Sequence, residues 1–333
     1  MPGRSSKMNY NELLERCKNR VYDQIVIAAE DAFKETSELR RVYHFEPEFL
    51  NLENGTAWVD GAECAYSEYV ISGWIGDIEL VVIQPVSGET IYKKYLDRFG
   101  TGICCLREQI LASEFDSTCG TYEGRGLKVG QCGEGYRIFD LMDDIGILYA
   151  IHAVDEVKAV SRNDRKICQI NISCPDVEEM AVKLAKYFEI GPYEIGHINN
   201  QTVGNLGIFV DGEMQQPEFE YLLGMNLCGN IEIETISPVK GPNCFADFIN
   251  ERPIGGYNHL KEVVPLSTGK WQKEIEHYED LGMQQCIKGK IGPCGWCFVD
   301  TMKEIGFLVE LGDEEPMTKL PDGYNAYFIP EKD

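Results

Sequence analysis

The chain has 333 residues and a formal net charge of −24, which comes from 55 acidic and 31 basic side chains. A chain of this length can form two domains of ordinary size, each with its own hydrophobic core. The strongly negative charge argues against nucleic acid or an anionic membrane surface as a partner.

Cysteine content and the N-terminal residues indicate the cellular compartment. The 13 cysteines make up about 4% of the 333 residues, which is low for a disulfide scaffold. The first twenty residues, MPGRSSKMNYNELLERCKNR, lack the apolar segment of a secretory signal, and nowhere do eighteen apolar residues follow one another. We therefore expect a cytoplasmic protein with free thiols and no membrane partner.

The first half of the chain alternates short apolar strands with helices and glycine turns. Residues 9–20 predict a capped helix, with Asn11 as its candidate N-cap, or a partly ordered arm. The charged segment 154–165 has no periodic apolar pattern and predicts a linker. Between them the patterns predict strands at about 21–28, 56–60, 66–74, 78–84, 102–106, 127–131, 135–140 and 146–152, and helices at about 31–42 and 91–99.

The second half repeats the first. KICQINI, which begins at Lys166, matches YDQIVI, which begins at Tyr22; IEIETISPVKG matches IELVVIQPVSG, and GGYNHL matches GTGICCL. Matching positions lie roughly 145 to 160 residues apart, which indicates a tandem duplication. A strand-helix-three-strand unit begins near residues 21, 102, 166 and 256. We therefore predict an α+β fold of four βαβββ modules whose sheets pair to bury their faces.

The stretch from Gly229 to Leu260 contains the first candidate site. In the strand 231–236 acidic and apolar residues alternate, and a Gly255-Gly256 turn precedes a second strand that carries His259. If the two strands are neighbours in a sheet, Glu234 and His259 can meet on one face. A carboxylate and an imidazole suit a divalent metal ion.

The four modules, the ELxxP-like strand end and the G-x-G-x-x-H turn resemble the vicinal oxygen chelate (VOC) superfamily. That superfamily includes glyoxalase I, methylmalonyl-CoA epimerase, extradiol dioxygenases and 4-hydroxyphenylpyruvate dioxygenase. The resemblance covers residues 21–312 and implies two VOC domains with curved mixed sheets. It divides the chain into an arm (1–20), a degenerate VOC domain (21–153), the linker (154–165), a metal-binding VOC domain (166–312) and a C-terminal tail (313–333).

The resemblance also implies a set of metal ligands, because this superfamily takes ligands from the first and last strands of paired modules. In the second half those positions are Gln169, Glu234, His259 and Glu310. The set is similar to that of glyoxalase I and implies one divalent ion, namely Zn, Ni, Co or Mn. Iron is less favoured, because Gln169 stands where a 2-His-1-carboxylate iron site would have a histidine.

The matched positions in the first half are Gln24, Val81, Cys105 and Ala150. Two of these four cannot bind a metal, so we expect this half to support folding, dimerisation or substrate enclosure. A shifted set that uses Glu79 and His152, two residues away on the same strand faces, stays open as an alternative.

The resemblance implies proton-transfer chemistry on a small molecule with two neighbouring oxygens. A metal ion would stabilise an enediolate or enolate while Glu310 or Glu234 removes a proton, with Glu310 favoured as the base. This is isomerase, epimerase or lyase chemistry. Three alternatives stay open: a ring-cleaving or 2-oxoacid dioxygenase, a non-catalytic binding protein of the bleomycin-resistance type, and an epimerase of CoA thioesters. A homodimer also stays open.

A CxxC motif, Cys294-Gly295-Trp296-Cys297, offers a competing metal site. It leads into a predicted strand, where residues three apart point to opposite faces. The chain has no second CxxC to complete a tetrahedral zinc site. We therefore expect these two cysteines to be structural.

Overall fold

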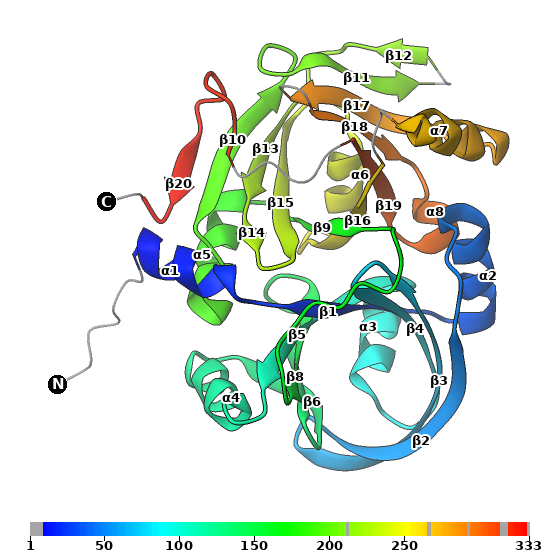
Figure 1. The fold of residues 1–333 in the computed structure, drawn as a ribbon, viewed down its shortest axis with the longest axis vertical. Helices are drawn as coiled ribbons and strands as arrows, with labels where there is room; N and C mark the ends of the chain where they lie inside the picture. Colours follow the sequence, from blue (N-terminus) through cyan, green and yellow to red (C-terminus); the bar gives the residue numbers. More distant parts are fainter. Residues whose placement is uncertain (1–8, 211–212, 265–267, 292–293, 314–318, 332–333) are drawn as a thin grey trace.

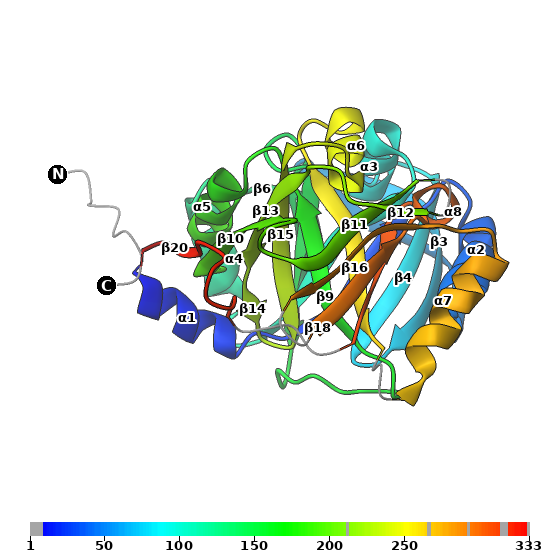
Figure 2. The ribbon, with the colours of Figure 1, turned by 90° about the horizontal axis from the view of Figure 1, so that it is seen from above.

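The computed structural model describes residues 9–210, 213–264, 268–291, 294–313 and 319–331. Two curved sheets lie against each other, one from each half of the chain, with helices packed on their outer faces and at their ends (Figure 1). Helices α1 and α7 lie at opposite ends of the molecule in both views (Figures 1 and 2). In the described part of the chain, no helix is long and apolar enough to cross a membrane.

The first half forms a closed barrel with the strand order β1-β4-β3-β2-β6-β7-β8-β5. Its strands are β1 (Tyr22–Ala28), β2 (Phe49–Val59), β3 (Ala62–Ile75), β4 (Ile78–Ser87), β5 (Gly102–Leu111), β6 (Lys128–Gly133), β7 (Tyr136–Leu141) and β8 (Ile147–Val154). The helices of this half are α1 (Tyr10–Lys18), α2 (Ala32–Tyr43), α3 (Ile91–Phe99) and α4 (Phe115–Gly124).

The second half forms a sheet of 12 strands, ordered β12-β11-β17-β18-β19-β16-β9-β15-β13-β10-β20, with β14 paired to β15. Its strands are β9 (Ile167–Ser173), β10 (Tyr193–Asn199), β11 (Gly204–Val210), β12 (Glu213–Gln215), β13 (Glu220–Met225), β14 (Leu227–Cys228), β15 (Ile231–Lys240), β16 (Gly256–Val263), β17 (Gln285–Ile291), β18 (Cys294–Val299), β19 (Leu308–Gly312) and β20 (Tyr327–Ile329). Its helices are α5 (Val177–Phe188), α6 (Cys244–Glu251), α7 (Lys270–Asp280) and α8 (Met302–Ile305).

The same strand pairing stands at the centre of both sheets. Strand β1 pairs parallel with β4 and antiparallel with β5, and β5 pairs parallel with β8. Likewise β9 pairs parallel with β15 and antiparallel with β16, and β16 pairs parallel with β19. The internal repeat is therefore visible in the tertiary structure, and it brings β15, β9, β16 and β19 side by side.

The second half departs from a bare repeat at three places. Along the chain, an extra hairpin, β11–β12, is inserted between β10 and β13 and pairs with β17 at the far edge of the sheet, and the short β14 precedes β15. Part of the segment predicted as a C-terminal tail forms β20, which pairs antiparallel with β10 at the edge of the sheet. This pairing satisfies backbone groups that an open edge strand would leave exposed.

Helix starts in the two halves follow the same local chemistry. Asp31 caps α2 and Asp176 caps α5, each accepting hydrogen bonds from two backbone N–H groups of the first turn. The predicted cap of α1, Asn11, is wrong by two residues. Asn9 caps this helix instead, because its side chain accepts from the Glu12 N–H while the Glu12 carboxylate accepts from the Asn9 N–H.

The two halves share one apolar core. A single cluster of buried side chains includes Ile25 and Ile27 of β1 together with Ile170 and Ile172 of β9. Burial of these β-branched side chains from both sheets stabilises the pairing of the halves as well as each sheet.

Arg165, the last residue of the predicted linker, also joins the halves. Its guanidinium donates to the backbone carbonyls of Tyr43 and His44 at the end of α2, at 2.9 and 2.8 Å. It also pairs with both carboxylate oxygens of Glu262 on β16, at 2.7 and 2.6 Å. Because Glu262 is buried, removing its partner Arg165 should lower the stability of the fold.

We expect Arg165→Ala to lower the free energy of unfolding by about 3 kcal/mol, because it leaves the buried Glu262 carboxylate without a partner. Arg40→Ala is the matched control, since Arg40 pairs with Glu46 on the surface and should cost less than about 1 kcal/mol. Urea unfolding of both variants measures the difference. Equal losses in the two variants would contradict the structural role of Arg165.

Candidate metal centre

One row of polar side chains crosses the four central strands of the second sheet. Gln169 on β9 is in register with Glu232 on β15 and with Lys261 on β16, and Lys261 is in register with Glu310 on β19. Each strand therefore contributes one polar residue at the same level of the sheet. Residues in register on neighbouring strands point to the same face.

A second level of the same face adds Glu234 and His259. Glu234 is in register with Asn171 of β9. On β16 the register shifts between Tyr257 and Leu260, so that one extra residue stands opposite β9. Such a bulge redirects side chains locally. His259 lies within this bulge, between Tyr257 and Leu260.

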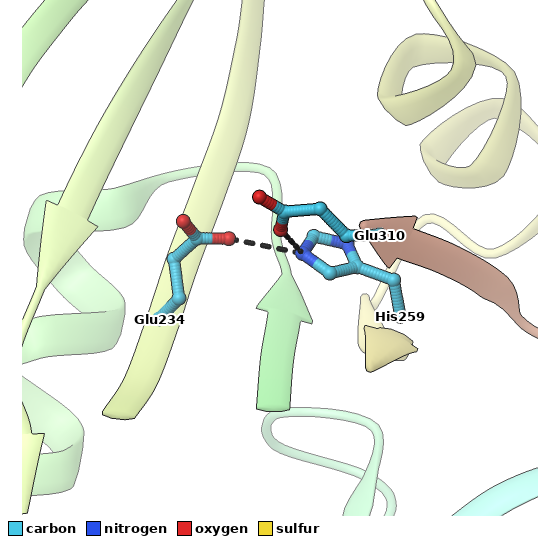
Figure 3. Close-up of side chains that lie close together, drawn as sticks. All are labelled: Glu234, His259 and Glu310. Atoms are coloured by element: carbon cyan, nitrogen blue, oxygen red, sulfur yellow. Dashed lines mark hydrogen bonds and ion pairs between the residues drawn. The ribbon is translucent and has the colours of Figure 1, made fainter. Parts of the chain in front are cut away.

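Glu234, His259 and Glu310 converge on one point (Figure 3). The His259 Nε2 atom lies 3.1 Å from Glu234 Oε2 and 3.4 Å from Glu310 Oε2. All three side chains are buried, and one ligand atom from each lies within 4.8 Å of the others. Ligand atoms about 2.0 to 2.2 Å from a common ion would have separations similar to these.

The fourth predicted ligand, Gln169, lies beside this cluster. Its Nε2 atom is 3.1 Å from Glu310 Oε2 and 3.5 Å from His259 Nε2. A half-turn of the amide exchanges its nitrogen and oxygen, so the same side chain can present an oxygen to a cation. The structure thus brings together all four residues that the sequence singled out, from four different strands.

Neighbouring amides orient the cluster. Asn258 Oδ1, which can only accept, lies 3.0 Å from His259 Nδ1. A neutral His259 therefore carries its proton on Nδ1 and turns the lone pair of Nε2 toward the two carboxylates. On the other side, Asn171 donates to Glu234 Oε2 at 3.0 Å and is itself held by the Ser173 hydroxyl.

The sequence interpretation missed Lys261 and Glu232. The Lys261 ammonium lies 3.2 Å from Glu310 Oε1, and Glu232 is buried with its Oε1 atom lacking a hydrogen-bond partner. The alternation in IEIETI signals that Glu232 shares a face with Glu234. Lys261 follows His259 by two residues, so the sequence likewise indicates that these two side chains share a face.

Burial and neighbouring charges act against each other in the cluster. Burial raises the pKa of Glu234, and His259 offsets this only in part. For Glu310 burial acts in the same direction, but Lys261 and His259 outweigh it and lower the pKa. For His259 burial favours the neutral ring, yet Glu234 and Glu310 outweigh it and raise the pKa. Two carboxylates that converge on one point attract a cation, and in this structure His259 and Lys261 supply the positive charge.

The polar face opens into a narrow cavity of about 40 Å³. Its floor includes Gln169, Glu232 and Glu310, and aromatic side chains of β13 and β18 form part of its walls: Tyr221, Trp296 and Phe298. The indole N–H of Trp296 is buried without a hydrogen-bond partner. The cavity thus combines apolar walls with a few unmatched polar groups, as ligand sites do.

The first half has no equivalent cluster within the described residues. Of its matched positions, Val81 and Cys105 are both in register with Val26 of β1, and Ala150 is in register with Arg107 of β5. The shifted alternative does not assemble either. Glu79 binds Gln24 at 2.7 Å, whereas His152 binds Asp23 at 2.8 Å.

The CxxC motif is described only in part. Cys297 is buried and carries a free thiol, whereas the side chain of Cys294 lies outside the described residues. All other cysteines with described side chains are also free, as the sequence predicts.

The donor set fits a divalent ion. Two carboxylates, one imidazole with its Nε2 atom directed inward and one amide converge without a thiolate, a set that suits several first-row transition metals. Lys261 opposes cation binding, but it contacts the Glu310 oxygen that faces away from His259. Glu310 Oε2 therefore stays available to an ion.

No family model matches this sequence, and no curated protein is significantly similar to it. The fold is similar to a variant of 4-hydroxymandelate synthase from Streptomyces coelicolor, with a TM-score of 0.58, 13% identity, and 90% of this chain and 94% of that chain covered. A halotolerant catechol dioxygenase matches with a TM-score of 0.48 and 11% identity, over 92% of this chain and 90% of that one.

A fusion protein of a xylose isomerase-like TIM barrel and 4-hydroxyphenylpyruvate dioxygenase matches with a TM-score of 0.49 and 9% identity, over 93% of this chain and 52% of that chain. The similarity to 4-hydroxymandelate synthase, which covers 90% of this chain, supports the predicted fold. At these identities the similarity does not extend to a reaction.

Proposed function

We propose that this chain is a divalent-metal-dependent enzyme that acts on a small molecule with two neighbouring oxygen atoms. The observation that carries the proposal is the buried convergence of Glu234, His259 and Glu310 beside a cavity with aromatic walls. Three strands bring one imidazole and two carboxylates within 4.8 Å of one another, and these are ligand types that divalent transition metals accept.

In this proposal Glu234, His259 and Glu310 hold the ion, and Gln169 completes the set through its amide oxygen. A bound ion would supply Lewis acidity toward the oxygens of the substrate. Asn258 and Asn171 keep His259 and Glu234 in place. Lys261 holds Glu310, and the Trp296 N–H can donate to a substrate oxygen, since no hydrogen-bond acceptor among the described residues contacts it.

An oxygen-dependent reaction is the first candidate for the chemistry. It was the alternative in the sequence interpretation, and the comparisons support it better than glyoxalase-type chemistry. The similarity to 4-hydroxymandelate synthase covers both halves of the chain. Such a reaction needs a redox-active ion such as Fe²⁺.

The ligand set favours a second candidate, proton transfer by an isomerase, epimerase or lyase. An iron dioxygenase ordinarily uses two histidines and one carboxylate, whereas this site offers one histidine and two carboxylates. A second carboxylate near the substrate can act as a general base. The Lys261 ion pair restrains Glu310, so we assign the base to Glu234 rather than to Glu310, which the sequence interpretation favoured.

Two measurements on the metal-loaded protein separate the candidates. With Fe²⁺ and a panel of catechols and 2-oxoacids, an oxygen-dependent enzyme consumes O₂ in proportion to product. With Zn²⁺, Ni²⁺, Co²⁺ or Mn²⁺ and a panel of 2-oxoaldehydes, 2-hydroxyketones and acyl-CoA thioesters, a proton-transfer enzyme exchanges the substrate C–H proton with deuterated solvent without consuming O₂. A protein that binds these ligands but shows neither activity would be a binding protein, against the proposal.

A further inference from the structure

The barrel of the first half encloses a cavity of about 460 Å³, which is separate from the candidate metal centre. Pockets of about 300 to 1,000 Å³ are typical of sites for small organic molecules. Strands from around the barrel line this cavity, and Tyr92 of α3 reaches it as well. Helix α3 lies within the curve of these strands (Figure 1).

Glu68 of β3 is the unusual residue in the wall of this cavity. Its side chain is only 4% exposed, and its Oε1 atom has no hydrogen-bond partner. Burial raises its pKa to about 7, although a hydrogen bond with the Thr90 side chain acts in the opposite direction. Glu53 of β2 also lines the cavity and is in direct register with Glu68. Like charges directly opposite on neighbouring strands destabilise a sheet unless a cation lies between or beside them.

The basic side chains of the same wall are already paired. The Arg107 guanidinium lies 2.9 Å from Asp23 and 3.8 Å from Glu79, and His152 lies 2.8 Å from Asp23. In the described part of the chain, no lysine or arginine forms an ion pair with Glu68. No lysine or arginine in the described part of the chain is therefore available to neutralise Glu68 when it ionises.

Three tyrosines share the cavity with Glu68: Tyr66, Tyr92 and Tyr136. Aromatic faces attract cations, and Glu68 lies close enough to all three rings to raise the pKa of each, although burial is the larger cause. A carboxylate among several aromatic rings is an arrangement that recognises organic ammonium groups through ion pairing and cation–π contact.

We propose that the barrel of the first half binds a small organic ammonium compound, whose positive group lies beside Glu68 and among Tyr66, Tyr92 and Tyr136. The site would give this half, which has no metal ligands, a binding role of its own. The inference uses none of the residues of the candidate metal centre and does not depend on the proposed function.

Choline and its uncharged isostere 3,3-dimethylbutan-1-ol test the proposal by titration calorimetry on the full chain, with n-propylammonium as a primary-amine probe. We expect one choline or n-propylammonium to bind per chain, at least about 10-fold more tightly than the isostere. Glu68→Gln should weaken this binding at least about 10-fold. Glu63→Gln is the matched control, because Glu63 is exposed on the same strand and should leave affinity unchanged.

Tyr92→Leu provides a second variant in case Glu68→Gln fails to fold, and it should weaken ammonium binding while circular dichroism stays unchanged. His259→Ala should bind the probes as the wild type does, because that residue belongs to the other half. The proposal is overturned if neither ammonium probe binds at 10 mM concentrations (roughly the weakest affinity of interest), if the isostere binds equally well, or if binding is lost in His259→Ala.

Discussion

His259→Ala should empty the metal centre. The wild-type chain is expected to retain about one divalent ion after dialysis, because only the second half brings suitable ligands together. His259 provides the only nitrogen among the four predicted ligands, and its ring is held between Glu234 and Glu310. Its removal also leaves two buried carboxylates next to each other without the imidazole, so any remaining site is weak and poorly ordered. Elemental analysis of the dialysed protein measures the loss and identifies the ion.

Cys105→Ala is the matched control for that experiment. Cys105 stands at the corresponding position of the first half and is fully buried, so its truncation perturbs the fold without touching the candidate centre. Metal content should stay at about one ion per chain. Two ions per chain in the wild type, or full occupancy in His259→Ala, would show that the assignment is wrong.

The second large effect is expected from Glu234→Gln. An amide oxygen can still bind the ion, but an amide cannot accept a proton, so the variant should keep most of its metal while proton exchange falls at least about 100-fold. The wild type and the variant are compared by deuterium exchange on the substrate found in the screen. Elemental analysis of the same samples separates loss of metal from loss of turnover.

Glu310→Gln is the informative counterpart, because the two glutamates differ in their contacts. Glu310 balances the Lys261 ammonium, and an amide in its place leaves that cation unpaired next to the ion. We therefore expect Glu310→Gln to lose metal affinity, which Glu234→Gln does not. If Glu234→Gln keeps turnover within about tenfold of the wild type while Glu310→Gln keeps its metal and loses turnover, the roles are reversed, as the sequence interpretation had them.

Much of the local structure follows from the sequence, because it depends on short-range patterns. The strand around Ile25 contains a continuous apolar run, whereas apolar and polar residues alternate around Ile170. Asp31 and Asp176 precede helices with the side-chain oxygen that a first turn needs. Alternation in the strand 231–236 places Glu232 and Glu234 on one face. The internal repeat then relates the two halves without any knowledge of contacts.

The four candidate ligands were also found from the sequence, but only through their positions in the repeat and the resemblance to a family. Their distances could not be predicted, because they depend on which strands become neighbours. Gln169 and Glu310 are 141 residues apart, and a shift of one residue in any pairing would turn a side chain to the opposite face. Strand β20 was not predicted either, since its pairing with β10 joins distant segments. The sequence interpretation also missed the hairpin β11–β12, whose two strands are local and whose only long-range pairing is that of β11 with β17.

The sequence alone determined the helices and strands, their duplication and the kinds of side chain available for chemistry. These features follow from local periodicity and composition. The tertiary structure alone decided how those side chains are balanced. The pairing of β16 with β19 brings Lys261 to Glu310, and the closure of the barrel surrounds Glu68 with tyrosines. Charge balance depends on distances of a few ångströms through a medium of low dielectric constant, and only the assembled strands define those distances.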